Sequence, residues 1–297
     1  MSTMVEISAT MVKELRERSG AAMMDCKKAL VEASGDFEKA FEWLRQKGIA
    51  VAQKKAGRTA SEGLVVAKLS ADNKTGSIAE INCETDFVAR NEEFVGLTNE
   101  LVGVALSQKA QNADELMQKP LNSGKVADFV TEKVAKTGEN IIIKRVATVD
   151  LNGKPGIIGL YVHALGGKMG ALVAIESSKE VDNSKLNDLA KDIAMHIVSA
   201  KPQFISRNEI PAEVIENERR IESGKADLAE KKPEMRDKIV QGRVDKLLAE
   251  RCLLEQPFVK DPSQTIAQFL SKKGAELGSE LAPKRFVMYI LGETEAQ

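Results

Sequence analysis

The chain contains few of the residues from which metal sites, disulfide frameworks and catalytic centres are built. Among its 297 residues there are three cysteines, Cys26, Cys83 and Cys252, and two histidines, His163 and His196. The cysteines lie far apart and form no C-x-x-C pair, so we expect neither a zinc site nor a disulfide framework. We expect the protein to work in a reducing compartment. No H-E-x-x-H or similar helical pair is present. We therefore expect no bound metal.

Long apolar runs and an excess of charge of either sign are also missing. No stretch reaches the roughly 18 apolar residues of a membrane span, and charged residues such as Glu6 and Lys13 stand where a signal peptide would be apolar. We therefore expect a cytoplasmic protein without a membrane partner. Lys and Arg number 43 against 44 Asp and Glu. This balance argues against a protein that directly binds nucleic acid.

No motif for enzyme chemistry stands out. The Gly-Lys pairs at 124–125, 153–154 and 167–168 lack the upstream glycine and the following Ser or Thr of a phosphate-binding loop. Cys83 and His163 could meet as a thiol nucleophile and its base, although nothing local distinguishes Cys83 from a small buried strand residue. We therefore expect no cofactor and a protein that acts by binding, not an enzyme.

The first 50 residues are predicted to form three short helices. Ser8 and Asp36 are suited to cap the first and third helices, and glycines follow the first two. Met23 and Met24 come directly after the first glycine turn. They either fill gaps in a small core or form an exposed, adaptable contact surface, and the pattern favours neither interpretation.

Beyond residue 62 the chain follows one plan twice. The pattern predicts strand pairs near 63–85 and 157–178, helices near 91–110, 125–137 and 184–200, and closing strands near 139–149 and 284–292. The predicted fold class is α+β, with a core of two similar subdomains. Each subdomain would be an antiparallel sheet covered on one face by helices.

A segment of different character, residues 211–251, interrupts the second half. It contains ten acidic and ten basic residues, with Val214, Ile221 and Leu228 recurring every seven positions. This pattern predicts an antiparallel helical hairpin that turns at Pro233 and has a narrow apolar seam. Such an arm either contacts a partner or packs on its own domain.

The two halves differ at the junction between the strand pair and the helix. The first half reads Cys83 to Asn91 (CETDFVARN), whereas the second half has Ser177 to Asp182 (SSKEVD) and no aromatic residue. Phe87, preceded by the acidic Asp86, is therefore a feature of the first half alone. Its ring either folds back as a hydrophobic staple for the next helix or projects as a contact.

The T-D-F-V-A run at Thr85 to Ala89 and the segment VKELRERSGAAMMDCKKAL at Val12 to Leu30 resemble the elongation factor Ts family, the guanine nucleotide exchange factors of bacterial translation. The runs at Ala194 to Pro202, Val240 to Arg243 and Gln256 to Val259 extend the resemblance. It implies the following parts: a three-helix UBA-like domain at 1–55, a linker at 56–62, core subdomains at 63–150 and at 151–210 with 252–297, and a dimerisation arm at 211–251.

The resemblance also implies a partner, the GTPase elongation factor Tu, and a possible homodimer formed through the arm. Asp86 and Phe87, flanked by Thr85 and Val88, would wedge into the GTPase domain and disturb its Mg²⁺ and phosphate site. Lys13, Arg16, Met23 and Met24 would dock on the same domain, and His163 would contact another domain. Some members carry a further helical module near the end, and its contacts are not carried over because only Glu293 to Gln297 follow the last predicted strand. A scaffold that binds a translation component without exchange activity is the alternative.

Overall fold

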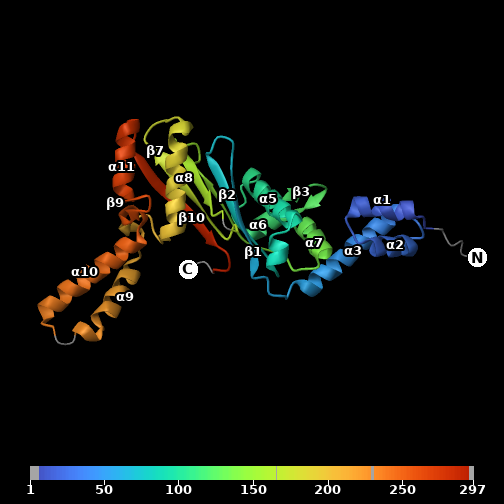
Figure 1. Cartoon of the computed structure of the whole chain (residues 1–297), viewed down its shortest axis with the longest axis horizontal. Coiled ribbons are helices and arrows are strands. Elements are labelled where there is room, and N and C mark those ends of the chain that lie inside the picture. Colours follow the sequence, from blue (N-terminus) through green and yellow to red (C-terminus); the bar gives the residue numbers. More distant parts are fainter. Residues whose placement is uncertain (1–6, 165, 229–230, 294–297) are drawn as a thin grey trace, which may run out of the picture. The chain divides into compact units, whose positions relative to one another are not determined.

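A computed structural model describes residues 7–164, 166–228 and 231–293 (Figure 1). The chain forms two compact units. The first comprises the described residues up to Val66, then Ala79–Val146 and those from Leu291, and the second comprises Ala67–Ile78 and Ala147–Ile290. Predictions that involve Glu6, Leu165, residues 229–230 or the last four residues fall outside the described part. The predicted α+β class is confirmed, because helices accompany two three-stranded sheets, while the predicted domain division stays a prediction.

The first unit begins with the three predicted helices, α1 (Ala9–Ser19), α2 (Met23–Glu32) and α3 (Phe37–Lys55). Ser8 and Asp36 cap α1 and α3 as expected, since their side chains accept bonds from the amides of Met11 and Lys39. Gly20 and Gly35 end α1 and α2 with left-handed backbones. A small core lies between the helices and consists of Val12, Leu15, Cys26, Ala29, Leu30, Ala40 and Leu44.

The first sheet has the strand order β1 (Glu62–Leu69), β2 (Thr75–Cys83) and β5 (Ile142–Asp150). The helices α5 (Glu92–Ser107) and α7 (Val126–Thr137) bury apolar stripes against it. Phe94, Leu101 and Ile81 are central members of this core. The strands and helices predicted here are confirmed. Four shorter elements were not predicted: α4 (Asp86–Ala89), α6 (Ala113–Gln118), β3 (Pro120–Leu121) and β4 (Gly124–Lys125).

The second sheet has the order β10 (Leu281–Ile290), β7 (Met169–Ser177) and β6 (Gly156–Val162), with antiparallel pairing throughout. Alternate residues of β7 share one core with apolar residues of α8 (Asn183–Ala200) and α11 (Ile266–Leu277). A β-carbon at Gly159 would stand 2.2 Å from the carbonyl oxygen of Ala190. Only glycine therefore lets the backbone of α8 lie so close to β6.

The predicted hairpin is present as α9 (Ala212–Ser223) and α10 (Pro233–Arg251), but two details of the prediction are wrong. The reversal begins at Gly224 and includes the short turn η2 (Ala226–Leu228), so Pro233 is the first residue of α10. Ile221 is also half exposed. Glu222 is buried beside it and pairs with Lys225 and Arg243, so the seam contains a charged residue where the heptad pattern predicted only apolar ones.

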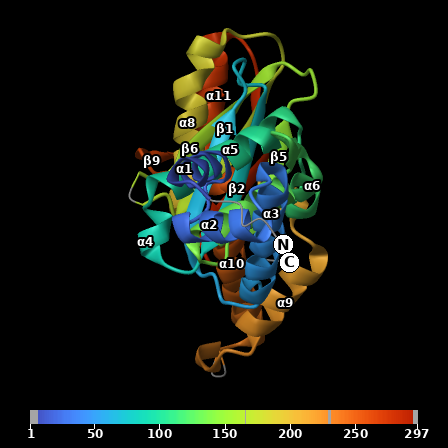
Figure 2. The ribbon, with the colours of Figure 1, turned by 90° about the vertical axis from the view of Figure 1, so that its right-hand side faces the viewer.

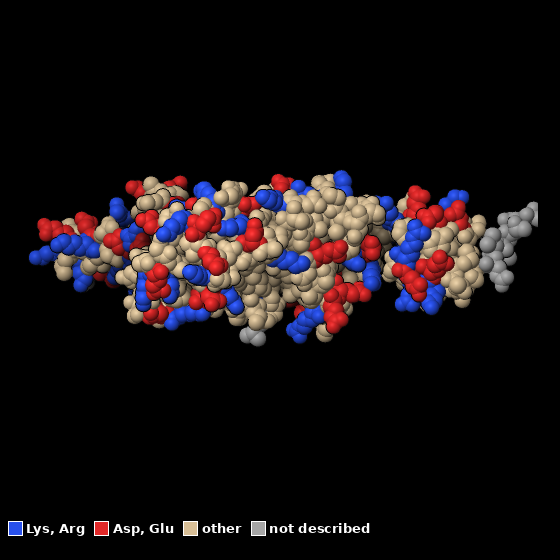
Figure 3. Space-filling model, turned by 90° about the horizontal axis from the view of Figure 1, so that it is seen from above, with Lys and Arg blue, Asp and Glu red and all other residues tan. Residues whose placement is uncertain are grey.

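The remaining elements follow α8 and α10 and were not predicted. They include α11 and the short elements η1 (Arg207–Glu209), η3 (Leu253–Glu255), β8 (Pro257–Phe258) and β9 (Asp261–Thr265). The signal for α11 is in the sequence, because Thr265 and Gln268 form a capping box ahead of Ile266 and Leu270. None of the helices in the described residues combines the length and the apolar character needed to cross a bilayer. On the surface seen in Figure 3, acidic and basic side chains are interspersed.

Candidate functional site

The candidate site is the short turn Thr85–Val88, called the Phe87 turn below, between β2 and α5. Thr85 is the N-cap of α4, and its hydroxyl oxygen accepts a bond from the amide of Val88 at 3.4 Å. Val88 packs against the first core, whereas the Phe87 side chain is 84% exposed. The staple interpretation of Phe87 is therefore wrong. Figure 2 shows α4 as a separate short turn of the ribbon.

Two carboxylates fasten the base of the Phe87 turn. The carboxylate of Glu139 accepts bonds from the amides of Glu84 and Thr85, each at 3.1 Å, and from the Thr85 hydroxyl at 2.6 Å. In return, the carboxylate of Glu84 accepts the amide of Asn140 at 2.7 Å. This bond, together with the nearby Arg58, keeps the pKa of Glu84 below its ordinary value. The backbone under Phe87 is thus held by charge-assisted hydrogen bonds.

Asp86 lies on the same turn and is paired locally. Its carboxylate is 3.0 Å from the guanidinium of Arg90, one helical turn later, and its side chain is 44% exposed. Asn91 then caps α5 by accepting a bond from the amide of Glu93 at 2.8 Å. The turn therefore presents an acid and a bare aromatic ring side by side to solvent.

Cys83 does not have the properties of a nucleophile. The thiol is fully buried, and burial, aided by the negative charge of Glu139, raises its pKa to about 12. It also donates a bond to the carbonyl oxygen of Thr85 at 3.2 Å. A thiol with this pKa remains protonated at neutral pH, and the thiolate is the reactive form. Cys83 is therefore a structural residue beneath the turn.

The three helices carry the other predicted contact residues of the first unit. Lys13 and Arg16 are exposed on α1, and Met23 and Met24 open α2 with side chains 52% and 72% exposed. The gap-filling interpretation of these methionines is wrong. Val31, 56% exposed near the end of α2, was not predicted as a surface residue. The helical spacing from Met24 to Val31 would have placed the two on one face, had Met24 been expected outside.

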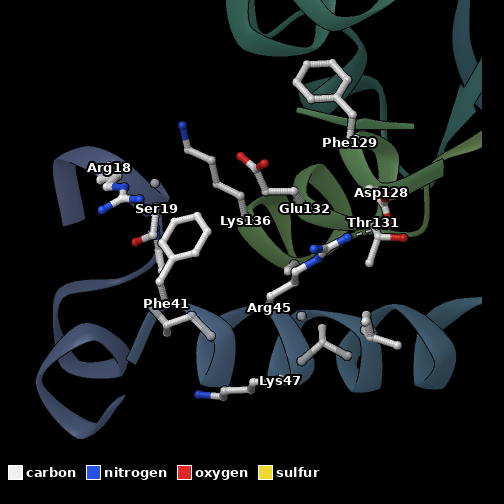
Figure 4. A pocket seen from close by; sticks show the side chains of 18 of the residues that line it. Arg18, Ser19, Phe41, Arg45, Lys47, Asp128, Phe129, Thr131, Glu132 and Lys136 are labelled. Carbon is white, nitrogen blue, oxygen red and sulfur yellow. Dashed lines mark hydrogen bonds and ion pairs between the residues drawn. The ribbon is translucent and has the colours of Figure 1, made fainter. Parts of the chain in front are cut away.

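A cavity of about 640 Å³ lies between the α1–α2 turn, α3 and α7, within the first unit. Figure 4 shows Arg45 of α3 directed toward Asp128 of α7, and their side chains are 3.2 Å apart. At the other end Arg18 lies over the ring of Phe41, 5.2 Å from its centre. Charged side chains therefore line both sides of the cavity, and several already have partners across it or beside it.

His163 belongs to the second unit and is half buried at the end of β6. Its Nδ1 is 3.1 Å from the hydroxyl of Tyr161, and its amide donates to the carbonyl of Met169. The other histidine, His196, is fully buried in α8. Its Nδ1 accepts the amide of Val259 at 3.2 Å, so Nε2 carries the proton and donates to Gln256 at 2.9 Å. His196 is thus a structural histidine.

Two features limit what chemistry the described residues can perform. No three side chains of His, Cys, Asp or Glu gather among them closely enough to hold a metal ion. The Phe87 turn itself offers an apolar ring and a paired acid, the Cys83 thiol beneath it is held protonated by its raised pKa, and the carboxylates of Glu84 and Glu139 are engaged by backbone amides. Such an arrangement is suited to inserting into a partner. Sequence reasoning missed Glu139, because a single acid after a helix-ending glycine has no distinctive pattern.

Comparisons with known proteins agree on one family. The family model described as "Elongation factor TS" matches residues 84–293. A protein named elongation factor Ts from Clostridium botulinum is 44% identical over 291 residues, which is 97% of this chain and 93% of the relative. Proteins of the same name from Nitratiruptor sp. and Nostoc sp. are each 42% identical, over 97% and 98% of this chain and 93% and 94% of their own lengths.

Proposed function

Because the chain belongs to the elongation factor Ts family of translation elongation factors, we propose that it releases GDP from elongation factor Tu by inserting Phe87 into the GTPase domain. The observation that carries this proposal is the 84% exposure of Phe87 on a turn fastened by hydrogen bonds. Moving an aromatic ring out of water is favourable, by on the order of 1.5 to 3 kcal/mol for a fully buried side chain. A ring presented in this way is suited to be the anchor of an interface.

Insertion of the ring between two helices of the GTPase would displace the segments that hold Mg²⁺ and the phosphates. The metal ion bridges phosphate oxygens of the nucleotide and neutralises their charge, so loss of its ligands weakens GDP binding. Asp86 stands beside the ring and contributes negative charge to the disturbed site. By linkage, any factor by which this chain weakens nucleotide binding also applies to its own binding when nucleotide is present. Fresh GTP therefore displaces it, and the cycle needs no covalent step and no enzyme activity of this chain.

The other predicted residues are assigned to docking. Lys13, Arg16, Met23 and Met24 would bind the same GTPase domain, where their exposure on α1 and α2 supports a contact surface. Flexible methionines adapt to a partner's shape, and the two cations steer the encounter. Thr85 and Val88 flank the ring and would lie at the same contact as Asp86 and Phe87. His163 would contact a second domain of the partner. The protein would act in the cytoplasm, with translation.

The hairpin of α9 and α10 is assigned to pairing with a second copy. Ile221 and Met235 are 50% and 54% exposed on it, which gives the arm apolar side chains that its own seam does not use. The concentration dependence of the molar mass, measured by sedimentation, tests this assignment. Monomers at all concentrations would contradict it without touching the exchange function.

The exchange function is tested by stopped-flow release of a fluorescent GDP from elongation factor Tu. We expect the release rate to rise with the concentration of this protein to a plateau, and the acceleration to shrink when Mg²⁺ is already chelated. A release rate that does not change while the two proteins demonstrably bind would contradict the proposal and favour the scaffold alternative.

A further inference from the structure

The structure assigns to Glu139 the role of the positioning residue that aims Phe87, an inference that rests on the proposed exchange function. Glu139 lies directly after Gly138, the left-handed glycine that ends α7. Glu139 would not contact the nucleotide and would act only through the Phe87 turn. Its two carboxylate oxygens hold backbone and side-chain atoms of that turn.

The carboxylate of Glu139 controls both sides of the Thr85 cap. Oε2 accepts the amides of Glu84 and Thr85 at 3.1 Å, and Oε1 accepts the hydroxyl of Thr85 at 2.6 Å. A hydroxyl has a single proton to donate. Since that proton points to Glu139, the oxygen's lone pairs are free to accept the amide of Val88 at 3.4 Å. Glu139 therefore orients the cap that starts α4.

Val88 and Ala89 anchor the far side of the Phe87 turn in the first core, so Glu139 is what fastens its N-terminal side. α4 contains only the four residues Asp86–Ala89, and a single helical turn is unstable by itself. The Phe87 residue is 84% exposed, so contacts of the ring itself do little to fix its position. Its direction therefore follows the backbone at Thr85, which Glu139 holds.

The segment 138–140 also ties this turn to the end of α3. The carbonyl of Gly138 accepts a bond from the Lys55 ammonium, and the Asn140 side chain donates to the carbonyl of Arg58 at 2.9 Å. Glu84 completes the tie by accepting the amide of Asn140. Residues 138–140 thus hold both the Phe87 turn and the end of α3, the helix that follows α1 and α2 with their predicted docking residues.

The test compares Glu139→Ala and Glu139→Gln with Ser279→Ala, a control at the corresponding junction of the second unit. Gln keeps one acceptor oxygen but replaces the other by a donor, so we expect the order wild type, Glu139→Gln, Glu139→Ala. Loss of charge-assisted bonds predicts about a 10-fold or larger fall in the GDP release rate at saturating exchange factor for Glu139→Ala. Ser279→Ala should leave this rate unchanged.

Two further readouts separate positioning from a general loss of structure. Hydrogen exchange at the amides of Glu84, Thr85 and Val88 should accelerate in Glu139→Ala, while the amides of Ile81 and Leu101 in the same unit keep their protection. In a Phe87→Ala background, Glu139→Ala should cause no further loss of GDP release, because a positioning residue acts only through the ring that it aims.

Three outcomes would overturn the assignment: unchanged exchange at the three amides, unchanged GDP release with loosened amides, or additive losses in the double variant. A wild-type protein that does not accelerate GDP release would contradict the proposed exchange function, and with it any role of Glu139 in exchange. The amide measurements are independent of that result, because they report only whether Glu139 holds the turn.

Discussion

The junctions that follow β2 and β7 both connect a strand to a helix, but they place the side chain at the same position differently. Phe87 and Val181 each stand four residues after the end of the strand, at Cys83 and Ser177. Val181 packs against the second core, whereas Phe87 is 84% exposed. The difference shows that the strand-to-helix plan does not itself expose a side chain at this position. Exposure is a property that the first junction adds.

Length and chemistry account for the difference. Residues 84–93 separate Cys83 from the first buried residue of α5, Phe94, whereas only residues 178–185 separate Ser177 from Leu186 of α8. The first connection is thus two residues longer and forms the extra turn α4. At both junctions the residue that hydrogen-bonds the connection follows a helix-ending glycine: Glu139 in the first and Ser279 in the second. Glu139 offers a carboxylate, whereas Ser279 offers a hydroxyl, which accepts the Lys179 amide at a longer 3.4 Å.

The largest expected effect concerns charged residues in the two sheets. Glu80 of β2 is fully buried and pairs with Arg145 of β5 at 2.7 Å, while its other oxygen accepts the amide of Gly292. In the second sheet, Arg285 is exposed and stands opposite Ala174. Arg145→Met should lower the free energy of unfolding by about 3–5 kcal/mol, because it leaves the Glu80 charge buried without its cation. Urea unfolding measures this.

The matched control for that variant is Arg285→Met, which should change the free energy of unfolding by less than about 0.5 kcal/mol because the side chain is exposed. Equal effects of the two substitutions would contradict the contrast between the sheets.

A smaller effect tests the contrast between Val181 and Phe87 directly. Val181→Ala removes two methyl groups from a half-buried position and should destabilise the protein by about 1 kcal/mol. Phe87→Ala removes a ring that is 84% exposed, so the free energy of unfolding should stay within about 0.5 kcal/mol of wild type. Thermal and urea unfolding of both variants decide this. A larger loss in Phe87→Ala would mean that the ring supports the fold.

The smallest expected effect concerns acid stability and again separates the halves. By the spacing of buried residues, His196 takes the place in α8 that Val104 takes in α5. Burial lowers the pKa of His196 below its ordinary value of 6.5. The unfolded chain then binds a proton before the folded one does, so stability is full above pH 6.5 and falls as the pH drops below it.

Unfolding titrations between about pH 7 and 5 measure this loss, and His196→Gln should remove its share of the pH dependence. An unchanged slope in that variant would assign the acid sensitivity to other groups.

Much of the fold follows from periodicity and caps, and the failures have local causes. Helices α1, α3 and α5 combine apolar stripes with Ser, Asp or Asn caps, and both strand pairs surround clear turns. The hairpin seam misled the heptad count because Glu222 is paired inside it, and ion pairs between helices leave no mark on apolar spacing. The four-residue α4 is shorter than any periodicity can register.

The site was only partly readable for a similar reason. The residues T-D-F-V-A are contiguous, so the sequence could name Phe87, but it left the direction of the ring open. That direction depends on Glu139, which is distant in sequence and contacts the turn only in the folded chain. The exposure of Met23, Met24 and Val31 likewise depends on how three helices pack, which spacing alone does not fix.

The role of the exposed Phe87 ring is tested by the GDP release rate of elongation factor Tu with Phe87→Ala, with Val181→Ala as the control. Loss of a buried aromatic anchor, on the order of 2 to 4 kcal/mol, predicts a loss of about 30-fold to 1,000-fold in stimulation by Phe87→Ala in a normally folded protein. Val181→Ala should stimulate release as wild type does. Full stimulation by folded Phe87→Ala would contradict the insertion of Phe87 as the cause of GDP release.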